Sequence, residues 1–345
     1  MLNKSGLAGL VRKLAGEKTR VAAPANRGAF TDFAEIRDLG EADLSRVNTR
    51  TSIKRFFMPQ SETILKYSRD GKAVKLDQAE PRKPRPTVII GARPCDAASL
   101  PIMDKLFRWD YDDRFWLDRR EATLVMSVSC TDCDASCFCT AIGLAPHATE
   151  GSDLLLTPSG PEEYRVEAVT DKGRAFVERN KEAFREKADA DKSAAWKNTA
   201  CKAALAKLPP AMDLAKVKAW LDKHFEDDVW ADASLKCVGC GCCTYLCPTC
   251  HCFDIVDEAT GERGVRRKNW DSCQFTQFTL HASGHNPRPE RRARWRQRVM
   301  HKFSYYVDRF GPRLCVGCGR CIRSCPVQMD IRRQLAGMED GIKMI

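Results

Sequence analysis

Short apolar runs rich in β-branched residues mark the first half of the chain. Pro86–Gly91 and Thr123–Val128 are short and mainly apolar, which is typical of strands buried on both faces. Asp153–Thr157 and Tyr164–Ala168 read as a further pair of strands, and Ala97–Phe107 follows the first strand with helical spacing. This alternation of strands and helix predicts an α/β domain over residues 54–169.

The flanking regions have different patterns. Residues 1–53 are polar and basic, with one short amphipathic stretch at Leu7–Leu14, so we expect an N-terminal arm. Residues 170–234 are rich in Lys, Glu, Asp and Ala, with spaced apolar residues and a break at Pro209-Pro210, which predicts a helical connector. We expect residues 235–345 to form an all-α domain that includes a helix over Arg288–Phe303.

Cysteine changes this picture most, because the chain has 18 of them. Eight fall in two copies of one pattern, C-x2-C-x2-C-x3-C-P: Cys237, Cys240, Cys243 and Cys247 before Pro248, and Cys315, Cys318, Cys321 and Cys325 before Pro326. This is the run that holds [4Fe–4S] clusters in ferredoxins. Residues 235–345 are therefore predicted to be a helical dicluster ferredoxin domain.

The spacing also assigns ligands. Three thiolates on a tight loop can bind three irons of one cubane. The fourth cysteine precedes a proline and points away from that loop, so it binds the other cluster. We therefore assign cluster 1 to Cys237, Cys240, Cys243 and Cys325, and cluster 2 to Cys315, Cys318, Cys321 and Cys247. Zinc is the alternative, but zinc ribbons use paired C-x2-C units, and a third cysteine with a terminal Cys-Pro, twice over, favours clusters.

A third group of cysteines lies in the predicted α/β domain. Cys95 and Cys130 each follow a predicted strand, at the sheet edge where ligands collect in α/β folds. With the loop residues Cys137 and Cys139 they provide four ligands for a third [4Fe–4S] cluster, leaving Cys133 spare. Their spacing is not a standard motif, so a zinc site or free thiols are the alternatives. Cys242, Cys250, Cys252 and Cys273 are expected to be buried thiols near the paired clusters.

Charge and length are consistent with metal binding. The formal charge is 57 − 46 = +11, but a [4Fe–4S] cluster with four thiolates carries about −2, so three would lower the net charge to about +5. The first residues show no apolar stretch of a signal peptide, and the apolar runs are too short to span a bilayer. We therefore expect a cytoplasmic protein without a membrane span, whose cysteines bind metal.

Several motifs together resemble a known family. They are Lys54-Arg-Phe-Phe-Met-Pro-Gln60 with Glu62, Gly91-Ala-Arg-Pro-Cys-Asp96, Cys130-x6-Cys137-Phe-Cys139, Gly143-x2-Pro146, and the first cysteine run continued by Cys250-His-Cys-Phe-Asp254. Over roughly residues 55–331 the chain resembles a family of iron–sulfur subunits found in sulfhydrogenases, as the β subunit, and in anaerobic sulfite reductases. The resemblance implies a three-cluster electron-transfer subunit between a flavoprotein that handles NAD(P)H and a catalytic partner. For that partner it implies a [NiFe] hydrogenase first and a sulfite reductase second.

The absence of several sequence motifs favours an electron-transfer protein over an enzyme with its own substrate site. The chain has no dinucleotide fingerprint, no phosphate-binding loop, no nucleophile elbow and no zinc-protease motif, so we expect no FAD or NAD site and no catalytic residue on it. The rival hypothesis is a cluster-containing nucleic-acid-binding or redox-sensing protein. Its basis is the run Arg288–Arg298, with six arginines and Trp295. Balancing the clusters or docking an acidic partner explains this run better, so no nucleic acid is expected.

Overall fold

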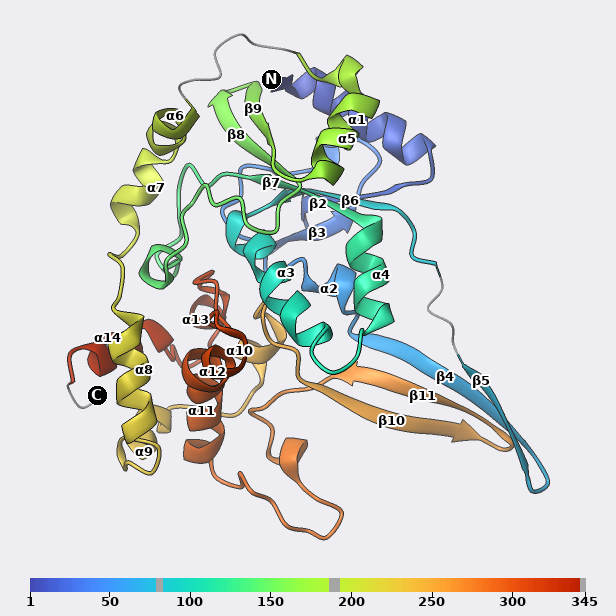
Figure 1. Cartoon of the computed structure of the whole chain (residues 1–345), viewed down its shortest axis with the longest axis vertical. Coiled ribbons are helices and arrows are strands. Elements are labelled where there is room, and N and C mark those ends of the chain that lie inside the picture. Colours follow the sequence, from blue (N-terminus) through green and yellow to red (C-terminus); the bar gives the residue numbers. More distant parts are fainter. Residues whose placement is uncertain (79–82, 186–192, 342–345) are drawn as a thin grey trace.

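A seven-stranded mixed sheet forms the upper half of the computed structural model, which describes residues 1–78, 83–185 and 193–341 (Figure 1). Its order is β1-β9-β8-β7-β6-β2-β3. The strands are β1 (Leu2–Asn3), β9 (Glu163–Ala168), β8 (Leu154–Gly160), β7 (Thr123–Val128), β6 (Thr87–Ala92), β2 (Arg20–Asn26) and β3 (Thr31–Glu35). The four central strands, β8, β7, β6 and β2, run parallel. The strands β9 and β3 pair antiparallel to them, and β1 pairs antiparallel with β9.

Successive side chains of the central strands point to opposite faces of this sheet, and both faces are buried in a hydrophobic core. Val88 and Ile90 of β6 face one hydrophobic core with α1 (Lys4–Gly16) and α5 (Asp171–Arg179). Ile89 faces the other core, beneath α2 (Lys54–Phe57), α3 (Pro94–Phe107) and α4 (Arg114–Ala122). The parallel strands are therefore buried on both sides, which explains why their sequences are continuously apolar.

The first fifty residues, expected to be an arm, are part of this sheet. Leu7, Leu10, Val11 and Leu14 form the buried stripe of α1 at helical spacing, and Asn3 caps the helix by accepting a hydrogen bond from the Gly6 backbone nitrogen at 2.8 Å. The strands β2 and β3 follow as an antiparallel pair. The amphipathic stretch seen in the sequence is thus a helix that covers one face of the sheet.

The expectation of an all-α C-terminal domain is wrong. This region contains a hairpin of β10 (Phe253–Thr260) and β11 (Arg263–Trp270), and β11 pairs with β4 (Ser61–Asp70) of a second hairpin, β4 and β5 (Ala73–Gln78). The four strands form a second sheet in the order β10-β11-β4-β5. In both hairpins a two-residue turn begins with a glycine of positive φ, Gly71 at 57° and Gly261 at 59°, the arrangement of a type II′ turn.

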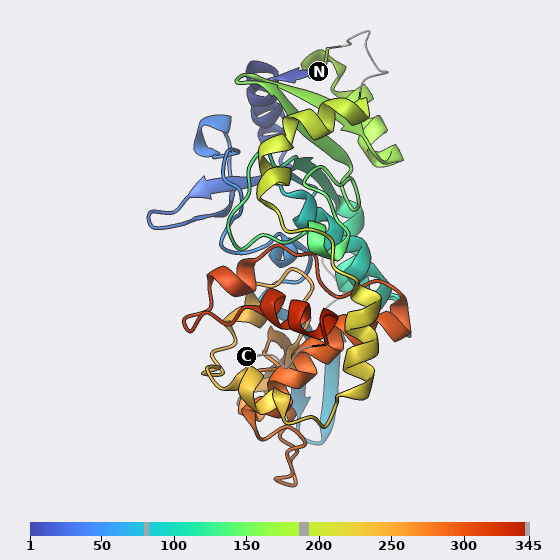
Figure 2. The same ribbon diagram turned by 90° about the vertical axis from the view of Figure 1, so that its left-hand side faces the viewer.

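Helices make up most of the remaining lower half (Figure 2). The predicted helix in the gap between the cysteine runs is α11 (Arg291–Met300), continued by a π-helical turn at His301–Tyr305 and by α12 (Tyr306–Phe310). It packs with the other helices of this half in one hydrophobic core. These are α8 (Leu214–Lys223), α9 (Val229–Ser234) and α14 (Ile331–Glu339).

The predicted break at Pro209-Pro210 lies between α7 (Lys202–Lys207) and α8, and α6 (Ser193–Ala200) precedes α7. No helix among the described residues is long and apolar enough to cross a membrane.

Candidate iron–sulfur sites

The two cysteine runs fold into loops of the same shape. Both begin with Cys-Val-Gly-Cys-Gly, and their glycines have left-handed φ values at matching positions: 68° at Gly239, 73° at Gly241, 60° at Gly317 and 71° at Gly319. Left-handed residues at alternate positions curl the backbone into a concave loop, around which successive cysteines can converge. A short helix follows each loop, α10 (Cys242–Tyr245) and α13 (Arg320–Arg323).

Site 1 is a cavity at the first loop. Cysteines of both runs line it: Cys237, Cys240 and Cys243 of the first, and Cys325 of the second. Apolar side chains and the cation Arg298 complete its wall. Among the described residues no three Cys, His, Asp or Glu side chains converge on the position of a single metal ion. Cys242 and Cys321 also line the cavity, so six cysteines and one cation border it. This donor set, which includes the four predicted ligands, is that of a cubane, whose irons and sulfides lie between its ligands.

Site 2 comprises the second loop and Cys247 of the first run. Burial raises the pKa of Cys315 to about 11 and also raises the pKa values of Cys318 and Cys321. The nearby Cys247 sulfur raises the pKa of each of these three thiols further. Cys247 is therefore within electrostatic range of the three cysteines of the other run, as expected of a ligand that crosses between motifs.

Site 3 lies where β6 and β7 end. Cys95 is in the first turn of α3, directly after β6, and Cys130 follows β7. Burial raises the pKa of Cys130 and of Cys139 to about 12, and interaction with Cys137 adds to both shifts. The Cys133 sulfur lies instead 3.7 Å from the carbonyl oxygen of Ala204. Three cysteines of the predicted set thus interact with one another, and Cys130 also raises the pKa of Cys95, though less than Cys318 does.

Raised pKa values have a consequence for metal binding. A buried thiol without metal is neutral, because burial disfavours the thiolate. Metal coordination requires the thiolate, so loading iron at these sites must release protons. Cys247 is the exception, because a hydrogen bond from Cys250 and the charges of Lys302 and Arg298 hold its pKa well below the usual range. One thiolate does not balance the buried cations near it, and bound clusters would supply more negative charge.

Three buried cations show whether the surroundings of sites 1 and 2 fit an anionic cluster. Lys54, Arg298 and Lys302 are each about 3% exposed. The ammonium group of Lys302 donates to the Cys247 sulfur at 3.4 Å, and Arg298 donates to the Cys250 sulfur at 3.5 Å. Lys54 donates to the Cys250 carbonyl oxygen at 2.9 Å and lies over the ring of Trp270.

None of these three cations forms an ion pair with a carboxylate among the side chains that the structure describes. An isolated buried charge costs several kcal/mol, so an anion is required nearby. A [4Fe–4S] cluster with four thiolates has that charge. The donor set of sites 1 and 2 thus fits an anionic cluster.

The three sites adjoin one another in a row. Cys321 of site 2 lines the cavity of site 1. On the other side, Cys95 of site 3 and Cys318 of site 2 pack in one small apolar cluster. The backbone nitrogen of Phe138 donates to the Gly317 carbonyl oxygen at 2.8 Å, and a Cβ at Gly317 would lie only 2.5 Å from the Cys139 Cα. Glycine is therefore needed where the loops of sites 2 and 3 meet.

A buried ion pair fixes the spacing of sites 2 and 3. Arg320, between Gly319 and Cys321, is fully buried and donates to both carboxylate oxygens of Asp96 at 2.7 and 2.9 Å. Asp96 is the neighbour of Cys95, so the pair joins a site 3 loop to a site 2 loop. Sequence reasoning missed this pair, because the partners are 224 residues apart and the two motifs that contain them give no sign that they meet.

Comparison with known proteins agrees with this geometry. Residues 236–329 match the model of the 4Fe-4S dicluster domain family. The chain is also 28% identical over 337 residues to sulfhydrogenase 2 subunit beta of Pyrococcus furiosus, an alignment that covers 94% of each protein. The chain is an iron–sulfur electron-transfer protein that resembles a sulfhydrogenase β subunit. No solved structure matches it.

The arginine run of this iron–sulfur protein serves its own fold. Arg294 and Arg298 are buried, and they donate to backbone carbonyl oxygens, Arg294 to Pro289 at 2.5 Å and Arg298 to Cys243 at 2.9 Å. Arg291 donates to the Cys237 carbonyl oxygen at 3.0 Å. Arg291 and Arg298 therefore hold the loop of site 1, and Arg294 holds the turn before α11. Of these three side chains only Arg291 is exposed.

The other thiols lie close to sites 1 and 2. Cys250 forms a hydrogen bond with Cys247, and Cys252 with Cys273. The Cys242 sulfur lies 3.3 Å from the Ser324 carbonyl oxygen. Burial lowers the pKa of His251 to about 3, so this histidine is neutral near physiological pH and cannot serve as a cation beside the clusters.

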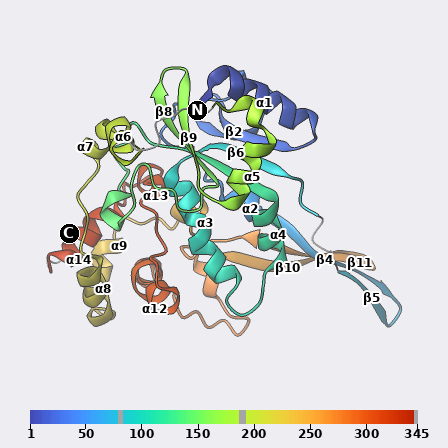
Figure 3. The same cartoon turned by 45° about the horizontal axis from the view of Figure 1, so that its top comes forward.

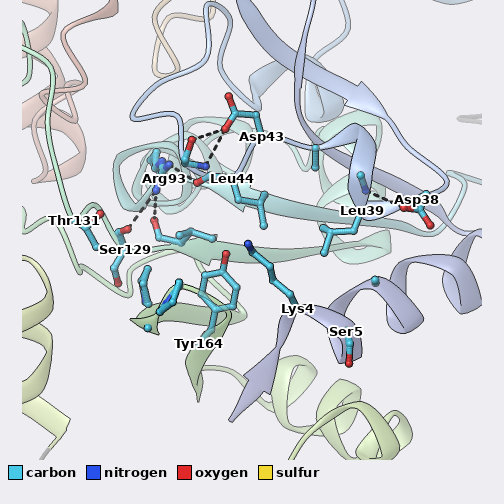
Figure 4. Close-up of a pocket in the computed structure, with 18 residues that line it drawn as sticks. Lys4, Ser5, Asp38, Leu39, Asp43, Leu44, Arg93, Ser129, Thr131 and Tyr164 are labelled. Atoms are coloured by element: carbon cyan, nitrogen blue, oxygen red, sulfur yellow. Dashed lines mark hydrogen bonds between the residues drawn. The ribbon is translucent and has the colours of Figure 1, made fainter.

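A separate cavity of about 710 Å³ opens at the ends of β6 and β7 (Figure 4). Ser129 and Thr131, on either side of Cys130, line it, as do Lys4 and Tyr164. The buried guanidinium of Arg93 borders this cavity and donates to the carbonyl oxygens of Leu44 and Arg46, which fixes the loop opposite the strand ends. The cavity therefore adjoins site 3, in the usual position of a ligand site in α/β folds.

Proposed function

We propose that the chain is an electron-relay subunit that carries three [4Fe–4S] clusters, at site 1, site 2 and site 3 in that order. The adjacency of the three sites is the observation that carries the proposal. Electrons pass between centres at short range, and here the loops that would hold neighbouring clusters touch each other. Site 1 is near the surface, since Cys240 is exposed, so one end of the row is accessible to a partner.

The residues around the sites have roles that follow from their contacts. Bound clusters would supply one-electron steps, with potentials set by charge, burial and hydrogen bonds to sulfur. Lys302 donates to the sulfur of Cys247 and stabilises negative charge at site 2. Arg298 does the same at the wall of site 1, while apolar walls exclude water. The ion pair of Asp96 and Arg320 keeps site 2 and site 3 at a fixed separation.

The partners follow from the similar protein and from the missing motifs. Its name is that of a hydrogenase subunit, and this chain has no dinucleotide fingerprint of its own. We therefore propose a cytoplasmic multi-subunit oxidoreductase in which a flavoprotein handles NAD(P)H and a [NiFe] sulfhydrogenase-type subunit is the catalyst. The iron–sulfur subunit of an anaerobic sulfite reductase is the alternative, and the name of the similar protein favours the hydrogenase.

The test uses the complex that a tagged chain retains when purified without oxygen from its own organism. Under hydrogen gas we expect the electron paramagnetic resonance (EPR) signals of reduced clusters, and NAD(P)⁺ should be reduced. The isolated chain should be bleached by dithionite but should not oxidise NADH or NADPH. A complex that reduces sulfite and does not react with hydrogen would replace the hydrogenase assignment by the alternative. Nicotinamide turnover by the isolated chain would contradict the relay role.

A further inference from the structure

The segment that leads from β3 to α2 packs against the junction of sites 2 and 3. The two sites meet where α13 lies beside the first turn of α3 (Figure 3). Thr49 of this segment is buried, and its carbonyl oxygen accepts a hydrogen bond from the buried Arg320 at 3.0 Å. The Thr49 hydroxyl accepts a second hydrogen bond from Arg320, also at 3.0 Å. The backbone at Thr49 is therefore fixed against the loop of site 2.

The preceding residue, Asn48, contacts both sites through one side-chain amide. Its nitrogen donates to the carbonyl oxygen of Cys318, in site 2, at 3.0 Å. The same nitrogen donates to the sulfur of Cys137, in site 3, at 3.7 Å. An amide nitrogen has two hydrogens, so one group can serve both acceptors. Among the side chains that the structure describes, no other donates a hydrogen bond to a sulfur of the four proposed ligands of site 3.

The orientation of this amide indicates what it binds. The Asn48 amide oxygen is buried and has no hydrogen-bond partner among the described residues. With the amide turned over, the oxygen would face two acceptors, the Cys318 carbonyl oxygen and the Cys137 sulfur, so the nitrogen must point toward them. Burying an unpaired oxygen is unfavourable, and this cost must be offset by the bonds of the nitrogen. A neutral thiol accepts weakly, whereas an iron-bound thiolate is charged and accepts strongly, so the arrangement suits Cys137 as a cluster ligand.

We propose that Asn48 is a positioning residue for electron transfer, which donates a hydrogen bond to the Cys137 thiolate and so raises the reduction potential of the site 3 cluster. This inference rests on the proposed function. Reduction adds negative charge that is shared with the cysteine sulfurs, so the hydrogen bond is stronger in the reduced cluster than in the oxidised one. At site 2 the same amide contacts a carbonyl oxygen and not a sulfur, so its effect on the potential there is smaller.

The experiment is an anaerobic redox titration of full-length variants followed by EPR spectroscopy, with the site 3 signal identified by its loss in Cys139→Ala. Asn48→Leu keeps the volume and removes the donor, and we expect reduction of site 3 to become about tenfold less favourable, a decrease of about 59 mV in its midpoint potential. Asn48→Asp keeps the shape but replaces the donor by a charged acceptor, so it should lower the potential further. Ser45→Ala is the control, because this side chain of the same segment contacts Asp43 and should leave both potentials unchanged.

Iron content separates this inference from the proposed function. About twelve irons per chain with an unchanged site 3 potential in both Asn48 variants would refute the role of Asn48 and leave the relay intact. A decrease of equal size at site 2 would also overturn it, because the effect would not be directed at Cys137. Loss of iron from both variants would show that Asn48 only holds the loops together. About eight irons in the wild-type chain would instead refute the third cluster, and this inference with it.

Discussion

Replacing Lys302 by methionine should lower the reduction potential of the cluster at site 2. The side chain is buried, and its ammonium group lies 3.4 Å from the Cys247 sulfur. Reduction adds one negative charge to a cluster, and a nearby cation stabilises the reduced form more than the oxidised form. Methionine has a similar length without the charge, so the substitution removes this difference and makes reduction harder.

The magnitude follows from the geometry. The added electron is spread over the irons beyond Cys247, about 6 Å from the ammonium nitrogen, and at an effective dielectric constant of about 20 the interaction is about 3 kcal/mol. One-electron potentials change by about 59 mV for each tenfold change in the equilibrium constant, which is about 1.4 kcal/mol. The expected decrease is therefore about 120 mV.

The assay is an anaerobic redox titration followed by EPR spectroscopy. Lys302→Arg, which keeps the charge, is the matched control and should stay within a few tens of millivolts of the wild type, about a fifth of the full effect. Iron content must be unchanged for the comparison to hold. An unchanged midpoint potential in Lys302→Met, with full iron, would show that the cation does not act on the cluster, and the electrostatic account of site 2 would be refuted.

Three further outcomes follow from the contacts between the sites. Cys325→Ala should remove the site 1 cluster and spare site 2, as judged by EPR, and loss confined to site 2 would refute the crossed ligand assignment. Arg320→Met leaves the buried carboxylate of Asp96 unpaired and should lower the free energy of unfolding by about 3–5 kcal/mol, whereas a thermal midpoint equal to that of wild type would contradict the role of the pair. Gly317→Ala brings a Cβ against Cys139 at a positive φ and should cost iron at both site 2 and site 3, and full iron content would show that the loops can move apart.

The central strands could be predicted from the sequence because burial on both faces leaves a simple pattern. The strand β7 has the predicted bounds, residues 123–128, and β6 (Thr87–Ala92) begins and ends one residue later than the predicted Pro86–Gly91. The second sheet gave no such pattern, because β10 is exposed along nearly its whole length and so lacks apolar alternation. The available signal was in its turns, where Gly-Glu and Gly-Lys dipeptides at 261 and 71 fit two-residue hairpins.

At the cluster sites, as in the sheets, local patterns could be predicted from the sequence and long-range contacts could not. Each cysteine run indicates its chemistry within about eleven residues, so the loops could be located from the amino-acid sequence alone. The contacts of Asp96 with Arg320 and of Lys302 with Cys247 join segments far apart in the chain. The first contact depends on how the two halves pack, and the second depends on how the helical turn after α11 packs against the first cysteine run. No local pattern records either. The roles of the buried cations therefore became visible only in the folded chain.

The most direct test of the three-cluster relay is a metal count on the chain purified without oxygen, together with Mössbauer spectroscopy. The account predicts about twelve iron atoms and as many sulfides per chain, all in four-iron clusters, and no zinc. About eight iron atoms, or zinc bound by the cysteines of site 3, would contradict it and leave a row of two clusters that ends at site 2.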